Sequence, residues 1–268
     1  MREKILVNRL TDNIRDLNET LNGQPNVDAY LVTGTKRAVL IDSLRNERSL
    51  FNVVRELTSL PLDVVLTHGH WDHAGVSIKD FHEAGHRIYL SEKDFYIFRD
   101  KEFSSLTHGL RTDYFTPLEE GMEFDLGSYK LEVITLAGHT PGSVVLLEKE
   151  KQHLYSGDSI GAGVFWMQLP GALPLKELRK NFGKLWNKVR DMNELMIHPG
   201  HRCQSPEQLG LGFLRDMILV TDNIISGAWP GEENETVLSN GRRLKCRSVA
   251  YNLIRDYCYN PENIQEKP

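Results

Sequence analysis

Short apolar runs alternate with amphipathic stretches along the first part of the chain. Residues 28–32 and 37–41 are rich in apolar side chains, and the segment Thr33-Gly34-Thr35-Lys36 between them predicts a hairpin turn. Apolar positions in residues 49–60 recur with helical spacing up to a proline, which predicts a helix. Residues 63–67 form a β-branched run typical of a buried strand. Strands and helices are therefore expected to alternate, as in an α/β protein.

The second half of the chain repeats this alternation. A longer helix is expected at residues 175–189, where apolar positions again have helical spacing. Short strands are expected around it, at residues 130–136, 143–147, 153–156 and 195–197.

Two further elements are expected near the end of the chain. Ser205-Pro206 has the residue types of a helix start, and we expect a helix from there to about Ile225. Asn240-Gly241 lies between Val237-Leu238 and Leu244-Lys245, which predicts a late hairpin.

Composition places the chain among ordinary globular proteins. It has 268 residues, of which 40% are hydrophobic and 26% charged, with a formal net charge of -5. No basic patch of the kind that follows a phosphate backbone is recognisable, so no nucleic acid partner is expected. No apolar run approaches the ~20 residues needed to span a bilayer, so no membrane association is expected either.

The N-terminal segment and the cysteines bear on the compartment. Residues 1–9 lack an apolar core of signal-peptide length. The three cysteines, Cys203, Cys246 and Cys258, match neither a zinc knuckle nor a redox pair, and we expect free thiols. Both observations predict a cytoplasmic protein.

The densest chemistry follows the strand at residues 63–67. His68, His70, Asp72 and His73 place three imidazoles and a carboxylate within six residues. These are ligand types that zinc-like divalent metals bind, and a catalytic site keeps one position open for water. Four such ligands are too many for one open site, so we expect two metal ions, each completed by a ligand from elsewhere. Asp158, which follows Gly157, is well placed to touch both metals.

These residues carry a resemblance to a known family. The run Thr67-His68-Gly69-His70-Trp71-Asp72-His73-Ala74-Gly75 resembles the signature of the metallo-β-lactamase superfamily. Gly138-His139-Thr140-Pro141-Gly142, Gly157-Asp158 and Pro199-Gly200-His201 resemble its later motifs, in the family's order. The resemblance covers residues 28–202 and is closest in motif to the hydroxyacylglutathione hydrolases (glyoxalase II).

The resemblance implies a ligand set for two divalent metal ions, expected to be zinc, with iron or manganese fitting the same donors. The first metal would be held by His68, His70 and His139, the second by Asp72, His73 and His201, and Asp158 would bridge them. His198 is a rival to His201, because it follows the same predicted strand three residues earlier.

The resemblance also implies a fold. It is of the α/β (α+β) class: a four-layer αββα sandwich, in which two mixed sheets face each other with helices outside. We expect this domain to occupy residues 1–230, with a C-terminal extension at residues 231–268 packed on the same domain.

The implied chemistry is hydrolysis. A hydroxide shared by two metals would attack an ester, thioester or lactone bond of a small molecule, and Asp72 could also orient that nucleophile or carry its proton. A phosphodiesterase or nuclease of the same fold and a di-iron redox enzyme stay open as alternatives. The glutathione-binding basic cluster of glyoxalase II is not recognisable in Arg242-Arg243-Leu244-Lys245.

Two stretches are candidates for substrate contact. Residues 161–170, which include Phe165-Trp166-Met167, are apolar and follow Asp158 directly. They are expected to form either a wall of the substrate pocket or a packing contact. The packing contact would lie in the core or against a second subunit, and a contact with a second subunit would make the protein a homodimer. Residues 103–115 form either a lid or an ordinary surface loop.

Overall fold

Three β-sheets and five helices make up the computed structural model, which describes residues 4–45, 50–99, 107–238 and 241–265. The first sheet has seven strands in the order β1-β2-β3-β4-β5-β6-β7. Their bounds are β1 Ile5–Arg9, β2 Ile14–Leu21, β3 Gln24–Thr33, β4 Ala38–Ile41, β5 Leu62–Val65, β6 Arg87–Leu90 and β7 Thr116–Pro117. The strands from β1 to β4 pair antiparallel, and those from β4 to β7 pair parallel, so this sheet is mixed.

The second sheet is also mixed. Its five strands have the order β13-β11-β10-β9-β8, and only β11 and β13 are parallel neighbours. Their bounds are β8 Glu123–Asp125, β9 Lys130–Thr135, β10 Val144–Glu148, β11 His153–Gly157 and β13 Met196–Pro199.

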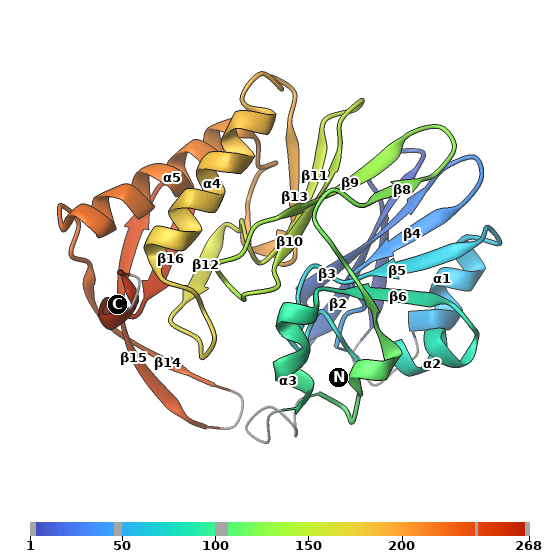
Figure 1. The fold of residues 1–268 in the computed structure, drawn as a ribbon, viewed down its shortest axis with the longest axis horizontal. Coiled ribbons are helices and arrows are strands. Elements are labelled where there is room, and N and C mark those ends of the chain that lie inside the picture. The colour runs from blue at the N-terminus through green and yellow to red at the C-terminus, as the bar shows by residue number, and fades with distance from the viewer. Residues whose placement is uncertain (1–3, 46–49, 100–106, 239–240, 266–268) are drawn as a thin grey trace.

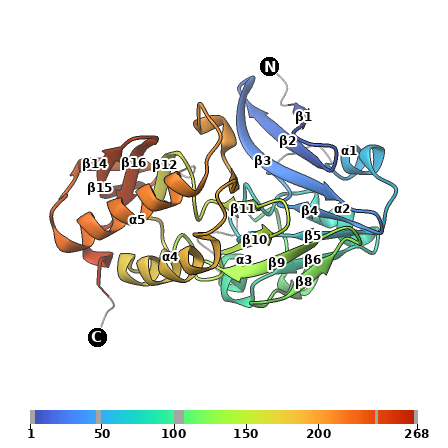
Figure 2. The same ribbon diagram turned by 90° about the horizontal axis from the view of Figure 1, so that it is seen from above.

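Helices cover the outer faces of these two sheets (Figures 1 and 2). On the side of the first sheet lie α1 Leu50–Leu57 and α2 Ile78–Glu83, and on the side of the second lie α4 Leu175–Val189 and α5 Leu211–Ser226. The short helix α3 spans Phe95–Arg99. The expected αββα sandwich of two mixed sheets is therefore confirmed.

Strand alternation explains the layers. In β3, Ala29 and Leu31 pack toward α1 and α2, whereas Tyr30 and Val32 pack between the two sheets. In β10, Val144 and Leu146 join the layer between the sheets, whereas Val145 and Leu147 face α4 and α5. Because both faces of these strands are buried, they read as continuous apolar runs in the sequence.

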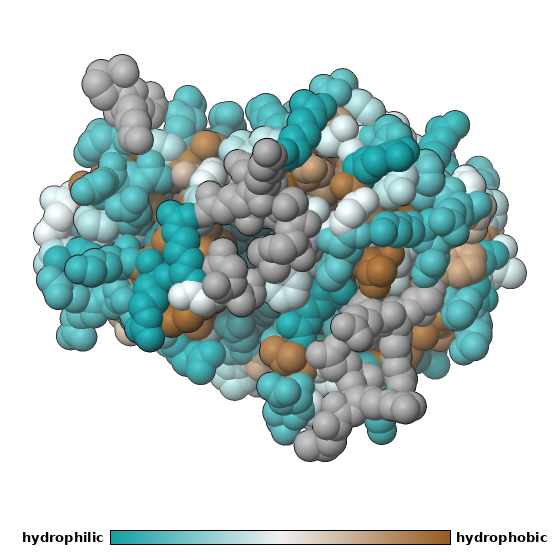
Figure 3. Space-filling model, turned by 90° about the horizontal axis from the view of Figure 1, so that it is seen from below, coloured by the Kyte–Doolittle hydropathy of each residue, from teal (hydrophilic) through white to brown (hydrophobic). Residues whose placement is uncertain are grey.

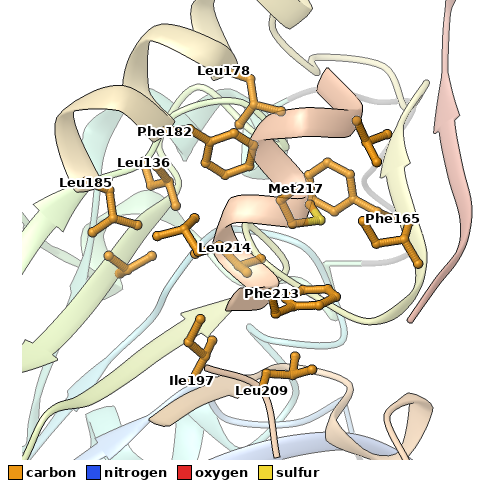
Figure 4. Packing of buried hydrophobic residues seen from close by; sticks show 14 of the residues in the cluster. Leu136, Phe165, Leu178, Phe182, Leu185, Ile197, Leu209, Phe213, Leu214 and Met217 are labelled. Atoms are coloured by element: carbon orange, nitrogen blue, oxygen red, sulfur yellow. The ribbon is translucent and has the colours of Figure 1, made fainter. Parts of the chain in front are cut away.

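A third sheet, which the sequence did not predict, adjoins the α4–α5 layer. Its strands have the order β12-β16-β15-β14, with bounds β12 Gly163–Met167, β16 Ile254–Tyr259, β15 Arg243–Tyr251 and β14 Glu232–Val237. Phe165 packs into the same core as Phe182 of α4 and Met217 of α5 (Figure 4). The predicted domain boundary at residue 230 stays a prediction, and the strands beyond it form one sheet with β12 before it.

Most of the predicted elements are present. The hairpin of β3 and β4 pairs Thr33 with Ala38, and the late hairpin of β14 and β15 pairs Val237 with Arg243. The helix predicted at residues 175–189 is confirmed as α4.

The helix start at Ser205-Pro206 was wrong. Helix α5 begins at Leu211 instead. The preceding segment is held extended, because the amide of Ile197 in β13 donates a hydrogen bond of 2.9 Å to the carbonyl of Leu209, and Leu209 is buried. A tertiary contact thus replaced the first turns that the local sequence favours.

Two further sequence predictions concern the cysteines and the membrane. Cys203, Cys246 and Cys258 are free thiols, as predicted. In the described part of the chain, none of the helices has the length and apolar character needed to cross a membrane.

The layer between the sheets contains a buried acidic group, Glu148, at the end of β10. Its Oε1 has no hydrogen-bond partner among the described residues. Burial, together with the nearby Glu150 carboxylate, raises the pKa of Glu148 from 4.5 to about 7 although Lys151 acts to lower it. The folded chain therefore binds a proton on the Glu148 carboxyl group more tightly than the unfolded chain does.

We expect the Glu148 carboxyl to make stability depend on pH. Its contribution is fully present below pH 4.5 and is lost as the pH rises through about 7, since the charged form is disfavoured by burial. Glu148→Gln, which resembles the protonated acid, should raise the free energy of unfolding at pH 8.5 by about 1–3 kcal/mol and leave it nearly unchanged at pH 4.5. Urea unfolding at both pH values measures this. The exposed control Glu194→Gln should change neither value, and equal effects of the two substitutions would contradict the prediction.

Candidate metal centre

Four of the candidate ligands lie in one tight turn after β5. The amide of His73 donates to the carbonyl of His70 at 3.0 Å, and the amide of Ala74 donates to the same carbonyl at 2.8 Å. This turn folds the chain back on itself, so that His68, His70, Asp72 and His73 all face one region at the carboxyl end of β5. Open α/β sheets carry their ligands at such strand ends.

The other three candidates follow strands of the second sheet. His139 comes after β9, Asp158 after β11 and His201 after β13. Parallel pairing aligns Gly157 with Pro199, so the ends of β11 and β13 lie together.

Two glycines permit this close approach. A Cβ on Gly200 would lie 2.4 Å from Cε1 of His73, and one on Gly157, which has a φ of +50°, would lie 2.2 Å from Oγ1 of Thr67. Since real Cβ atoms do not come this close to other atoms, only glycine fits either position.

All seven candidate residues come together. Their ligand atoms form three overlapping groups, each with all its atoms within 4.8 Å of one another. The groups are His68, His70 and His139; His68, His73 and Asp158; and Asp72, His73 and His201.

Asp158 lies between the outer groups. Its Oδ1 is 3.2 Å from Nε2 of His73, and its Oδ2 is 3.5 Å from Nε2 of His201 and 3.7 Å from Nε2 of His139. One carboxylate thus contacts histidines of both sets.

Outer hydrogen bonds orient the imidazole rings. Nδ1 of His139 donates to the carbonyl of Trp166 at 2.8 Å, and Nδ1 of His201 donates to the carbonyl of Asn26 at 2.7 Å. Because a carbonyl only accepts, Nδ1 of each ring carries a proton and Nε2 faces the cluster.

Asp42 orients two more rings. Its Oδ2 accepts from Nδ1 of His73 at 2.8 Å and from the hydroxyl of Thr67 at 2.9 Å. Having donated its hydrogen to Asp42, the Thr67 hydroxyl accepts from Nδ1 of His68 at 3.1 Å. The outer partners of metal-binding histidines in proteins are of these types.

Electrostatics divides the histidines into two kinds. Burial, together with the neighbouring imidazoles, lowers the pKa of His68 well below its usual value and that of His70 to about 3, so both rings are neutral. Burial also disfavours charge on His73 and His201, but Asp158 and the other nearby carboxylates outweigh it and raise their pKa. Two carboxylates, Asp72 and Asp158, are therefore shared among several rings.

The cluster passes a test for metal binding. Nε2 of His68 and Nε2 of His73 are buried and have no hydrogen-bond partner of good geometry among the described residues. A buried nitrogen lone pair without a partner is costly, and a divalent cation would satisfy it. The donors are nitrogen and oxygen only, which fits zinc, iron or manganese.

Asp94 ties the two ligand loops together. Its buried carboxylate accepts hydrogen bonds from the amide of Gly69 at 2.9 Å, the hydroxyl of Thr140 at 2.7 Å and the amide of Gly142 at 2.7 Å. One side chain therefore fixes the loop of His68 and His70 relative to the loop of His139.

Comparison with known proteins agrees with this geometry. The profile of the metallo-beta-lactamase superfamily matches residues 22–205. The chain belongs to the metallo-beta-lactamase superfamily.

Individual members of the superfamily are more distant. The chain is 32% identical to the hydroxyacylglutathione hydrolase GloC of Haemophilus influenzae over 134 residues. This match covers 48% of this chain and 63% of that enzyme. It is 28% identical to the acyl-coenzyme A thioesterase MBLAC2 of Gallus gallus over 169 residues. That match covers 52% of this chain and 60% of the thioesterase. The match thus spans less than two thirds of the length of either relative.

A solved structure shares both sequence and fold. TTHA1623, determined in a di-iron-bound form, superposes with a TM-score of 0.57 and 30% identity over 73% of this chain and 95% of its own.

A cavity of about 430 Å³ opens beside the candidate ligand cluster and contains His70, Asp72, Asp158 and His201 in its wall. The remaining wall is mainly apolar and comes from Leu21, Trp71, Ala162, Val164, Phe165, Trp166, Leu169, Pro170, Val237 and Leu238.

Residues 161–170 contribute both to the cavity wall and to the core, and the subunit contact stays a prediction. Val164 and Trp166 are half-buried and line the cavity, whereas Met167 is buried in the core with Phe165.

Two other candidates lie outside the centre. His198 is buried beside β11, where Nε2 of His198 lies 2.9 Å from Nδ1 of His153 and its ring stacks on Tyr155. Part of the predicted lid, residues 103–106, lies outside the described residues, and the described residues of that segment do not line the cavity.

Sequence reasoning missed Asp42 and Asp94. A signal for Asp42 exists, since it directly follows the apolar run of β4 just as His68 follows that of β5. Asp94 has no comparable local signal, because its role depends on two loops that are distant in sequence.

We expect Asp94→Asn to loosen both ligand loops. The amide retains one acceptor but loses the charge, and its NH2 group then faces donors, so the free energy of unfolding should fall by about 2–3 kcal/mol. Metal affinity should fall about tenfold or more, because the loops that carry His70 and His139 are no longer held together. Urea unfolding and competition with a chelator measure these effects. The exposed Asp113→Asn should leave both unchanged, and unchanged metal affinity in the Asp94 variant would contradict the expected role.

Proposed function

We propose that this chain is a dinuclear metal-dependent hydrolase that cleaves an ester, thioester or lactone bond of a small molecule. The observation that carries the proposal is the position of Asp158, whose two oxygens lie 3.2–3.7 Å from histidines of both ligand sets. A carboxylate shared in this way offsets the mutual repulsion of two cations. A single-metal site would leave half of the cluster without a role.

The proposed ligands are those of the sequence motifs. His68, His70 and His139 would hold one ion, Asp72, His73 and His201 the other, and Asp158 both. Two divalent ions bound there would supply a water nucleophile of lowered pKa and polarise the scissile carbonyl. Zinc is the proposed metal, and iron fits the same donors.

Asp72 is proposed to act on the proton of the nucleophile as well as bind metal. Its carboxylate lines the cavity, and its Oδ2 lies 3.5 Å from Nε2 of His201. Although burial alone would raise its pKa, His73 and His201 lower it to about 2, so Asp72 is ionised and can accept a hydrogen bond from the water nucleophile.

The cavity supports an acyl substrate over a phosphodiester. Among the described lining residues, Arg45 is the one lysine or arginine, and it is already paired with the buried Glu19 at 3.4 Å. A phosphodiester groove is expected to present several cations. The names of GloC, a hydroxyacylglutathione hydrolase, and MBLAC2, an acyl-coenzyme A thioesterase, both denote thioester substrates, which favours this class of bond.

Metal content and substrate range test the proposal. Natively purified protein should contain close to two equivalents of metal per chain, and should hydrolyse at least one of a panel of p-nitrophenyl esters, acyl thioesters and lactones. Removal of metal with a chelator should abolish turnover, and zinc should restore it. Cleavage of bis(p-nitrophenyl) phosphate alone would point to the phosphodiesterase alternative, and one tightly bound metal would reject the dinuclear site.

Asp158→Ala should have a larger effect than a change in the outer partners. The substitution removes the shared carboxylate, so the positive charges of the two metal ions are less well compensated. At least one metal equivalent should therefore be lost, and kcat should fall by roughly 10²-fold or more. Elemental analysis and steady-state kinetics measure this. Two retained metals with near-normal kcat would show that Asp158 is not shared.

A pair of substitutions separates His201 from His198. His201→Ala should lower the metal content toward one equivalent and reduce kcat, since its Nε2 faces Asp72 and Asp158. His198→Ala should keep two equivalents and lower the free energy of unfolding by about 1–2 kcal/mol, because it removes a buried hydrogen bond to His153. The opposite pattern of metal loss would reassign the second ligand set.

A further inference from the structure

We propose that the hairpin of β14 and β15 determines substrate specificity, by closing the cavity over an uncharged apolar acyl chain. The acyl nature of the substrate rests on the proposed function. The hairpin lies beyond residues 22–205, the segment that matches the superfamily. Val237 and Leu238, at the end of β14, nevertheless line the same cavity as the metal centre.

The residue pattern of β14 changes where the strand reaches the cavity. Glu232, Glu233 and Glu235 are exposed acidic residues, as is usual for an edge strand in water. Val237 follows them and is 54% exposed, the highest value among the large hydrophobic residues that the structure describes. Exposed apolar residues beside a cavity are typical of a ligand-binding surface.

The surroundings make this pair unusual. Seen from below, on the side toward which the hairpin extends, the surface is mostly hydrophilic and its apolar residues form separate small areas (Figures 1 and 3). Val237 and Leu238 belong instead to an apolar lining that continues inward to Leu169, Pro170 and Phe165.

The hairpin is held in place relative to the opposite wall. Nε2 of Gln168, directly after β12, donates to the hydroxyl of Thr236 at 2.7 Å, and both side chains are buried. Sheet pairing makes a second connection, from β14 through β15 and β16 to β12. Val237 is thus positioned by its neighbour Thr236 against the wall that carries Val164 and Trp166.

The charges of the cavity define the ligand. Among its described lining residues, the ionisable groups are Arg45, paired with Glu19, and the candidate ligands His70, Asp72, His139, Asp158 and His201. The wall from β12 and the hairpin has no charged side chain. A chain with a charged end would leave that charge unpaired there, so the part of the substrate that faces the hairpin is uncharged and apolar.

Binding of neutral probes tests the proposal independently of turnover. Trp71 and Trp166 line the cavity, so tryptophan fluorescence reports binding. The wild-type protein should bind octanamide about 100-fold or more tightly than acetamide, because six additional methylenes leave water. The double variant Val237→Asn with Leu238→Asn should weaken octanamide binding about tenfold and leave acetamide binding within about twofold.

Two further variants serve as controls. Leu219→Asn alters an exposed leucine of α5 outside the cavity and should retain the full preference for octanamide. Val237→Ile with Leu238→Met keeps the wall apolar and should also retain it. Loss of preference in this conservative variant, an unchanged double asparagine variant, or equal binding of the two amides by the wild type would each overturn the proposal.

Kinetics distinguish this inference from the proposed function. With p-nitrophenyl acetate and octanoate, the double asparagine variant should lose about tenfold in kcat/KM on octanoate and little on acetate. If the binding preference is present but no ester, thioester or lactone is cleaved by the metal-loaded protein, the proposed reaction fails and the apolar wall stands. If hydrolysis occurs and the preference is absent, the hairpin has no role in specificity.

Discussion

Four histidine rings direct their Nε2 atoms inward, and the loops around the centre are arranged to hold them in that orientation. His68, His73, His139 and His201 each bind an outer partner through Nδ1, and those partners are Thr67, Asp42 and two backbone carbonyls. The outer bonds fix the ring orientations, so the Nε2 atoms converge with the oxygens of Asp72 and Asp158. Among the described residues, Nε2 of His68 and Nε2 of His73 have no hydrogen-bond partner of good geometry, so both are available to a cation.

The two sheets make that convergence possible. One sheet delivers the turn after β5, and the other delivers the ends of β9, β11 and β13. Gly157 and Gly200 remove the Cβ atoms that would keep these segments apart, and Asp94 connects two of the loops. The centre is therefore held by both halves of the sandwich, at the strand ends that border the layer between the sheets.

The third sheet lines the cavity beside the candidate metal centre. Strand β12 contributes Phe165 and Met167 to the core and Val164 and Trp166 to the cavity, so one strand supports the fold and shapes the pocket. The same sheet continues through β16 and β15 to the hairpin end at Val237. Substrate preference can thus change through this hairpin without disturbing the ligand turn, which belongs to another sheet.

The sequence by itself determined the local elements and the family. Alternating apolar runs predicted β3, β4 and α4, because these depend on side-chain periodicity within a few residues. The spacing of His68, His70, Asp72 and His73 predicted a two-metal cluster, because a short turn leaves few other uses for four such ligands. The resemblance to the superfamily then supplied the distant candidates and favoured His201 over His198.

Only the tertiary structure decided the features that depend on long-range contacts. The pairing of Leu209 with Ile197 delayed the start of α5, although Ser205-Pro206 favours an earlier one. Asp94 joins two ligand loops, and the hairpin end at Val237 reaches a cavity that Leu21, from the other end of the chain, also lines. Local periodicity carries no information on such contacts, because the energy that forms them comes from burial and hydrogen bonding between segments that only the complete fold brings together.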